Sequence, residues 1–143
     1  MLNSSKRKQI VNIFLAAGAL SGMLAVIIGA FGAHGLENLL SEHAMQRFHT
    51  GVEYQFYHVA ALLSVGILAN NHKNMPRILK LSGIFFIMGI LLFSGSLYLY
   101  ALTGKTFFGI ITPFGGLGFI GGWLLLILYI IKHTKSTQLI HKQ

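Results

Sequence analysis

Four long runs of apolar residues dominate the chain, and short polar segments separate them. The runs have between 18 and 25 residues, at positions 10–33, 52–69, 79–102 and 107–131. A helix rises about 1.5 Å per residue, so about 20 apolar residues cross a hydrocarbon core that is about 30 Å thick. The pattern predicts an all-α membrane protein with four transmembrane helices in a compact bundle, as a single transmembrane domain over residues 1–143.

The fourth run contains Pro113 and allows two interpretations. A single helix over 107–131 would kink at Pro113, because proline removes a backbone hydrogen bond. In the other interpretation Pro113 is the first helical residue, a favoured position for proline, and Thr112 caps the N-terminus. We favour the second, because residues 113–131 still suffice to span. It leaves residues 107–111 as an apolar loop at the membrane interface.

The composition supports a lipid environment. Hydrophobic residues make up 54% of the chain and charged residues 10%, whereas soluble domains carry about 25% charged residues. The net charge of +8 invites a nucleic-acid function, but the eleven basic residues stand in short groups beside the apolar runs. They form no basic stripe interleaved with aromatic residues. We therefore expect the lipid bilayer as a partner and no nucleic acid.

The basic residues also predict the orientation, because lysine and arginine favour the cytoplasmic side of a membrane. Arg47 and Lys105 flank one end of the spans. The other nine flank the opposite end: Lys6, Arg7, Lys8, Lys73, Arg77, Lys80, Lys132, Lys135 and Lys142. The distribution predicts a multi-pass protein of the cell membrane with the N- and C-termini in the cytoplasm.

The polar segment after the first run is too amphipathic for a fifth span. Its apolar residues share one helical face, with polar residues opposite. These apolar positions are Leu36, Leu39, Leu40, Ala44 and Phe48. The spacing predicts a short amphipathic helix on the outer surface, between spans one and two. An ordinary exposed helix packed on the bundle fits the same pattern, and both alternatives stay open.

Glycines recur at helical spacing in the first and fourth runs. Gly18 and Gly22 form a GxxxG pair, and Gly29 follows on nearly the same face. The corresponding glycines of the fourth run are Gly115, Gly118 and Gly122. Such stripes let helix backbones approach closely in lipid, so we expect packing residues. The pattern leaves open whether they pack within one chain, in a homo-oligomer or against a membrane-protein partner.

Polar residues within the runs gather near the outer surface, and all four runs contribute. The candidate polar cluster comprises His34, Tyr54, Gln55, His58, Ser94, Ser96, Tyr98 and Thr112. Ionisable groups inside a span are costly, so the cluster is a candidate functional site. Three interpretations stay open: a hydrogen-bonded network between helices, a site for an ion, proton or small ligand, and a metal or haem site between His34 and His58.

The chain carries few residues suited to catalysis or cofactor binding. It has no cysteine, and its three acidic residues are Glu37, Glu42 and Glu53. Zinc sites usually have three or four protein ligands, more than two histidines supply. No nucleophile elbow, HExxH motif or phosphate loop occurs. We expect no catalytic residue, no metal and no cofactor.

Several of these stretches occur together in one known family. They are residues 29–35 (GAFGAHG), 54–58 (YQFYH), 93–98 (FSGSLY), 111–116 (ITPFGG) and 121–123 (GGW). From about Phe14 to Ile131 the chain resembles the YgdD-like family of small membrane proteins of unknown function. The resemblance implies a multi-pass membrane protein and brings no activity, substrate or cofactor. Its motif residues correspond to most of the candidate polar cluster and to Pro113.

The pattern favours a non-enzymatic integral membrane protein, as an accessory or structural component of the cell envelope. The small-residue stripes and the lack of catalytic motifs are the basis for this expectation. The alternative is a small transporter or channel, in which the candidate polar cluster binds an ion, a proton or a solute.

Overall fold

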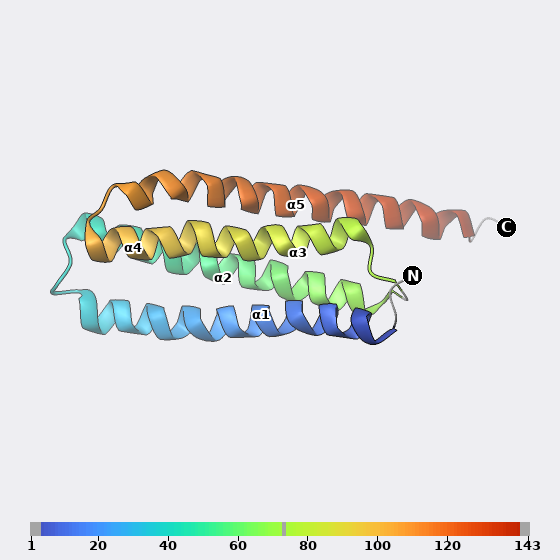
Figure 1. The fold of residues 1–143 in the computed structure, drawn as a ribbon, viewed down its shortest axis with the longest axis horizontal. Helices are drawn as coiled ribbons and strands as arrows, with labels where there is room; N and C mark the ends of the chain where they lie inside the picture. Colours follow the sequence, from blue (N-terminus) through green and yellow to red (C-terminus); the bar gives the residue numbers. More distant parts are fainter. Residues whose placement is uncertain (1–3, 73, 141–143) are drawn as a thin grey trace.

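The chain folds into a bundle in which four long helical segments run alternately up and down (Figure 1). The computed structural model describes residues 4–72 and 74–140. Two of the four segments contain a turn of π-helix, marked η. The elements in chain order are α1 (Ser4–Phe31), η1 (Gly32–Leu36), α2 (Glu42–Asn70), α3 (Arg77–Gly89), η2 (Ile90–Ser94), α4 (Gly95–Thr103) and α5 (Phe107–Ile140).

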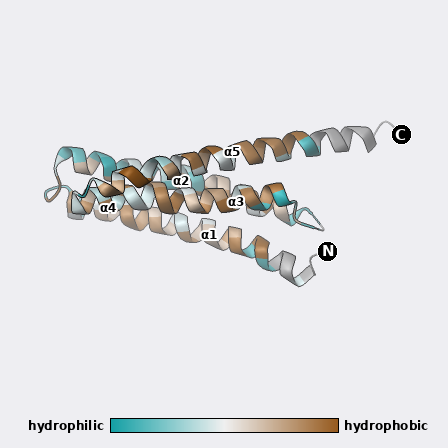
Figure 2. Ribbon diagram, turned by 45° about the horizontal axis from the view of Figure 1, so that its top comes forward, coloured by the Kyte–Doolittle hydropathy of each residue, from teal (hydrophilic) through white to brown (hydrophobic). Residues whose placement is uncertain are grey.

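Each segment is long and apolar enough to cross a membrane. The four stretches are Gln9–Leu36, Glu42–Asn70, Arg77–Thr103 and Phe107–His133. Apolar residues occupy the middle of the bundle and hydrophilic residues gather toward its ends (Figure 2). Large apolar side chains such as Ile27, Ile110 and Leu117 are exposed, as expected where lipid is the solvent. The predicted all-α fold with four membrane-length helices is confirmed.

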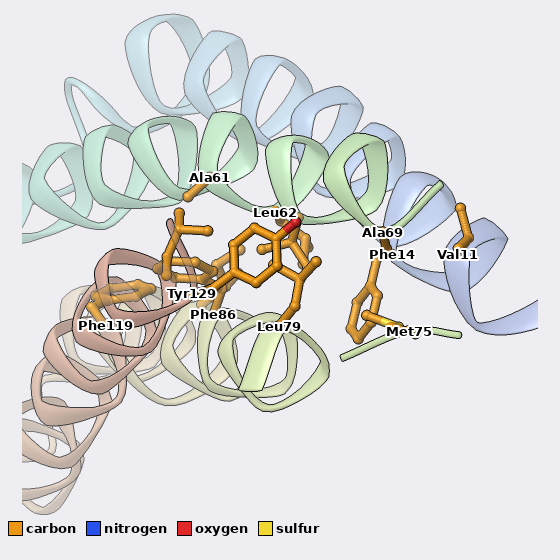
Figure 3. Close-up of a cluster of buried hydrophobic side chains, with 13 residues drawn as sticks. Val11, Phe14, Ala61, Leu62, Ala69, Met75, Leu79, Phe86, Phe119 and Tyr129 are labelled. Atoms are coloured by element: carbon orange, nitrogen blue, oxygen red, sulfur yellow. The ribbon is translucent and has the colours of Figure 1, made fainter. Parts of the chain in front are cut away.

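A core of apolar side chains joins all four segments (Figure 3). α2 is central, since it packs against α1 and also against the third segment, while α5 packs mainly on α3. Leu62 of α2 and both Leu79 and Phe86 of α3 are fully buried. Phe14 of α1 and Phe119 of α5 complete the core from the two outer segments. Close packing of this kind is the main source of helix association in lipid.

The segment between Leu36 and Phe48 is not the separate amphipathic helix that we predicted. Leu36 ends η1, residues 37–41 form a turn, and the rest of the segment is the start of α2. α2 begins there because Ser41 caps it: the Ser41 hydroxyl accepts a hydrogen bond from the Ala44 backbone N–H at 3.3 Å. No proline follows, so the helix continues into the second span. Phe48 packs on the bundle, in a second apolar cluster.

The preferred prediction for the fourth span, a helix that begins at Pro113, is wrong. α5 begins at Phe107 and Pro113 lies inside it. A loop at 107–111 would present unpaired backbone groups to lipid, each at a cost of several kcal/mol, whereas a helix pairs nearly all of them. The Thr112 hydroxyl lies 3.3 Å from the Phe108 carbonyl and donates to it. This bond adds a polar contact at the turn where proline removes one.

Candidate functional site

The glycines of α1 lie in its contact with α2. A Cβ atom added at Gly18 would lie 2.7 Å from the Leu63 side chain, and one at Gly22 would lie 3.4 Å from Val59. Gly29 also faces α2, where an added Cβ would lie 3.2 Å from a valine. The pairs keep a constant antiparallel register. The stripe therefore packs between two helices of the same chain.

The glycines of α5 face the third segment, and the approach is closest at Gly115. A Cβ at Gly115 would lie 2.7 Å from the backbone Cα of Phe93 and nearer still to its nitrogen. At Gly118 the nearest atoms belong to the backbone of Gly89, at 3.4 Å. An added Cβ at Gly122 would meet a phenylalanine ring of α3 at 2.7 Å. Backbone rather than side chain limits the approach at the first two positions.

Gln55 ties three segments together. Its side chain is 4% exposed. The amide nitrogen Nε2 donates to the backbone carbonyl of Ser21 in α1 at 2.7 Å. The amide oxygen Oε1 accepts from the Tyr98 hydroxyl of α4 at 2.8 Å. An unpaired amide in an apolar interior costs free energy, so these bonds favour one relative position of α1, α2 and α4.

His58 is held by α5 and by its own helix. The side chain is 6% exposed, and its Nε2 lies 3.2 Å from the indole Nε1 of Trp123. An indole N–H only donates, so His58 Nε2 is the acceptor. The proton therefore sits on Nδ1, which donates to the Tyr54 carbonyl at 2.7 Å. The ring of Phe119 stacks on the imidazole, with centroids 3.4 Å apart. Both ring nitrogens and one ring face are thus occupied.

The remaining predicted residues form separate contacts rather than one cluster. The Ser96 hydroxyl lies 3.0 Å from the Phe93 carbonyl and 2.8 Å from the Thr112 hydroxyl, and the hydrogen bond between the two hydroxyls joins α4 to α5. Tyr54 is partly exposed and its ring stacks on Phe93 at 4.5 Å. Ser94 is fully buried in η2, and its hydroxyl has no hydrogen-bond partner within the described ranges.

His34 is not brought to the other polar residues. It is exposed in η1, and it lies twelve residues beyond Gly22, which faces Val59. At about 1.5 Å per residue this puts His34 about 18 Å along the bundle from the level of His58. Among residues 4–72 and 74–140, no group of three or more His, Cys, Asp or Glu side chains is placed to hold a metal. The two histidines do not form a ligand pair.

The sequence reasoning missed the partners that α5 supplies. Trp123 and Phe119 contact His58, and Ser82 of α3, fully buried, donates to the Gly122 carbonyl at 2.8 Å. Two signals were available: Trp123 is the one tryptophan of the chain, and Phe119 precedes it by four residues on the same helical face. Neither signal says which residue of another helix lies opposite.

A second polar contact lies at the other end of the bundle. The His72 ring nitrogen Nε2 hydrogen-bonds to the Tyr129 hydroxyl. The His133 ring lies 4.7 Å from that of His72 and 4.5 Å from that of Tyr129. Burial lowers the pKa of His72, and repulsion from a charged His133 lowers this pKa further. This contact joins the α2–α3 connection to α5.

Known proteins match most of this chain. The family described as "Protein of unknown function (DUF423)" matches residues 28–116. The UPF0382 membrane protein YwdK of Bacillus subtilis (strain 168) is 39% identical over 123 residues, which cover 86% of this chain and 99% of that protein. The chain belongs to the UPF0382 membrane protein family. The UPF0382 inner membrane protein YgdD of Escherichia coli (strain K12) is 36% identical over 122 residues, 85% of this chain and 92% of that protein.

Membership in the UPF0382 family confirms the resemblance to YgdD and the expectation of an integral membrane protein of unknown biochemical role. The UPF0382 membrane protein SH2409 of Staphylococcus haemolyticus (strain JCSC1435) is 42% identical over 85% of this chain and 98% of that protein. These names state no enzymatic or transport activity. No solved structure matches the chain. The family match spans the polar residues from His34 to Thr112 and ends before Trp123.

Proposed function

We propose that this UPF0382 protein is a non-enzymatic structural or accessory component of the cell membrane. One observation carries the proposal: the two most polar buried side chains, Gln55 and His58, use their hydrogen-bonding groups inside the bundle. Gln55 bonds at both ends of its amide, to α1 and to α4. His58 bonds through both ring nitrogens. These groups hold helices in register and are not available to a ligand.

The contacts argue against the alternatives of transport and catalysis. A transported ion or proton needs lone pairs or a titrating group that faces a path through the protein. Here a phenylalanine ring covers the His58 imidazole and an indole N–H occupies its lone pair. Acid–base catalysis by a histidine needs a ring nitrogen that faces a substrate, and both ring nitrogens of His58 are bonded inside the bundle. Interhelical hydrogen bonds of about 0.6 kcal/mol each are enough to select one register of a bundle.

The proposal includes partners and orientation. The lipid bilayer covers the outward apolar residues. The protein acts together with a second copy or with another membrane protein, and it does not bind nucleic acid. Both termini lie in the cytoplasm. The distribution of lysine and arginine supports this orientation: Arg77 and Lys80 stand at one end of the bundle and Arg47 and Lys105 at the other. Lys73 and Lys142, which entered the same prediction, lie outside the described residues.

Cysteine labelling tests the orientation cleanly, because the chain has no cysteine of its own. We expect Thr106→Cys to react with a membrane-impermeant maleimide in intact cells. Asn74→Cys should react only after the membrane is permeabilised. Reaction of Asn74→Cys in intact cells would place the termini outside and reverse the orientation.

Flux measurements in proteoliposomes test the non-transporting role. We expect the wild-type protein and His58→Gln to show the same proton and zinc permeability as empty vesicles. Cross-linking in native membranes, followed by purification, should recover a stoichiometric partner or a dimer. A proton or zinc flux that His58→Gln abolishes, with thermal stability unchanged, would replace the accessory role by transport.

A further inference from the structure

A groove opens on the bundle at the end that carries the α1–α2 and α4–α5 connections. Its volume is about 360 Å³, within the range of about 300–1,000 Å³ that small-molecule sites occupy. The wall is mostly apolar and aromatic, with Phe93, Leu97 and Tyr100 from the third segment and Thr112 and Pro113 from α5. One charged side chain, Arg47 of α2, also lines it. The groove is separate from the contacts of Gln55 and His58.

The guanidinium of Arg47 retains its hydrogen-bonding capacity. Its carbon Cζ lies 4.3 Å from the centroid of the Tyr100 ring. Within residues 4–72 and 74–140, this ring contact is the interaction that the structure records for Arg47, and no carboxylate pairs with it. The Tyr100 hydroxyl also has no hydrogen-bond partner there. A cation with five N–H donors therefore stands beside a free hydroxyl at the mouth of an apolar groove.

Gly109 makes room for this arrangement. A Cβ atom at Gly109 would lie 2.9 Å from the Tyr100 ring. The missing side chain lets the ring lie against the first turns of α5, where Arg47 stacks on it. A cation over an aromatic face is attracted by the ring quadrupole, which holds the guanidinium in place.

The depth of Arg47 matches the level of lipid headgroups. The α2 stretch Glu42–Asn70 has 29 residues and is about 43 Å long, longer than a hydrocarbon core of about 30 Å. The apolar part of α2 begins at Val52. Arg47 lies five residues before it, about 7 Å above the edge of the apolar core. Tyrosine is enriched at this same interface.

We propose that the groove binds one anionic phospholipid. The Arg47 guanidinium and the Tyr100 hydroxyl donate hydrogen bonds to the phosphate, and an acyl chain lies along Leu97, Phe93 and Pro113. Arginine suits a phosphate because its planar N–H groups match two oxygens at once. Basic pockets between membrane helices bind anionic headgroups in the same manner on the cytoplasmic side. In the proposed orientation the Arg47 end takes its lipid from the outer leaflet. The site thus combines a charged end and an apolar wall, as a phospholipid does.

Native mass spectrometry of the detergent-purified protein tests the site, with phosphatidylglycerol and phosphatidylcholine as probes. We expect wild-type protein to retain phosphatidylglycerol, and Arg47→Gln to bind it about tenfold more weakly, the effect of losing one charge-assisted interaction. Lys105→Gln is the matched control, since it removes one positive charge at the same end and does not line the groove. It should change the affinity less than twofold. Arg47→Lys, which keeps the charge, should fall between wild type and Arg47→Gln.

Three results would overturn the proposal. Equal losses in Arg47→Gln and Lys105→Gln would indicate a general attraction to charge, and equal retention of both lipids by wild type would remove the role of the headgroup. Displacement of the lipid by millimolar inorganic phosphate would assign the site to a free anion. A photoactivatable phosphatidylglycerol tests the same site without any substitution. It should label the peptide around Leu97 or that around Pro113, and labelling confined to other helices would contradict the assignment.

Discussion

Similar patterns of glycines form the contact of α1 with α2 and the contact of α5 with the third segment (α3 and η2), yet the glycines face different groups in the two contacts. Along α1, Gly18 and Gly22 face branched side chains of α2, whose ends have some freedom to move. Along α5, Gly115 faces the backbone of Phe93 and Gly118 faces the backbone of Gly89. Backbone has no such freedom, so a GxxxG pattern alone does not set the cost of a larger residue.

Polar contacts follow the same division. Among the described residues, one side-chain hydrogen bond joins α1 to α2, from Gln55 to the Ser21 carbonyl. Between the third segment and α5 there are two, from Ser82 to a backbone carbonyl and between Ser96 and Thr112. The contact between α5 and the third segment therefore leaves less freedom for the two helices to shift. Substitutions there should lower the free energy of unfolding more than substitutions in the α1–α2 contact.

The largest effect is expected at Gly115. Gly115→Ala puts a methyl group against the Phe93 backbone, so the two helices must separate. Overpacking costs about 1–3 kcal/mol, and we expect about 3 kcal/mol here because no rotamer change relieves the contact. The measurement is the free energy of unfolding in mixed micelles with a denaturing detergent.

Gly116 supplies the control for this prediction. At Gly116 the nearest atoms to an added Cβ belong to the Phe93 ring at 3.7 Å, an ordinary contact distance. Gly116→Ala should change the free energy of unfolding by less than about 1 kcal/mol, the size of the glycine-to-alanine propensity difference. Equal effects of the two substitutions would mean that α5 shifts freely on the third segment, and the distinction between the α1–α2 contact and the α5 contact would be lost.

The next effect concerns the bond between α2 and α5. His58→Leu leaves the Trp123 N–H without its acceptor. Trp123 is 43% exposed, but the surrounding lipid offers no acceptor, and an unpaired donor away from water costs about 1–3 kcal/mol. We expect a loss of about 2 kcal/mol in the free energy of unfolding. In a Trp123→Phe background the donor is gone, so His58→Leu should cost about 1 kcal/mol less, the coupling energy of a double-mutant cycle.

The cycle also has a result that would contradict the bond. If His58→Leu cost the same in both backgrounds, the hydrogen bond to Trp123 would contribute nothing. The stacking on Phe119 and the bond to the Tyr54 carbonyl would then account for the loss. His58→Gln is informative here too, since an amide still has both a donor and an acceptor. It should be milder than His58→Leu.

Hydropathy was sufficient to predict the four spans, because a lipid solvent requires long apolar helices with internally paired backbone. It was not sufficient to predict the start of the fourth helix near Pro113. Local preference places a proline at a helix start, but the membrane penalises the unpaired backbone of a loop at residues 107–111. The advantage of an uninterrupted helix also explains the segment before Phe48. Ser41 caps the helix there, and the segment forms the first turns of α2.

The candidate polar cluster was only partly predictable. Gln55 and His58 stand three residues apart in α2, and both side chains are buried. Their partners depend on the register between helices, which a single sequence does not contain. The Ser21 carbonyl has no sequence signature at all, and His34 lies too far along α1 to take part. Membrane depth alone therefore grouped residues that the bundle keeps apart.

The smallest effect separates the two glycines of the α1 pair, which the sequence treats alike. A methyl group at Gly18 would lie 2.7 Å from a Leu63 methyl, while one at Gly22 would lie 3.4 Å from Val59. Alanine is favoured over glycine in a helix by about 0.5–1 kcal/mol. At Gly22 no close contact offsets this gain, so Gly22→Ala should raise the free energy of unfolding slightly.

At Gly18 the Leu63 side chain must move first, and an off-rotamer shift costs about 0.5–1.5 kcal/mol. Gly18→Ala should therefore be about 1 kcal/mol less stable than Gly22→Ala. The free energies of unfolding of the two variants, measured in the same micelles, test this order. If Gly18→Ala is the more stable, the closest approach of α1 to α2 lies somewhere other than Leu63.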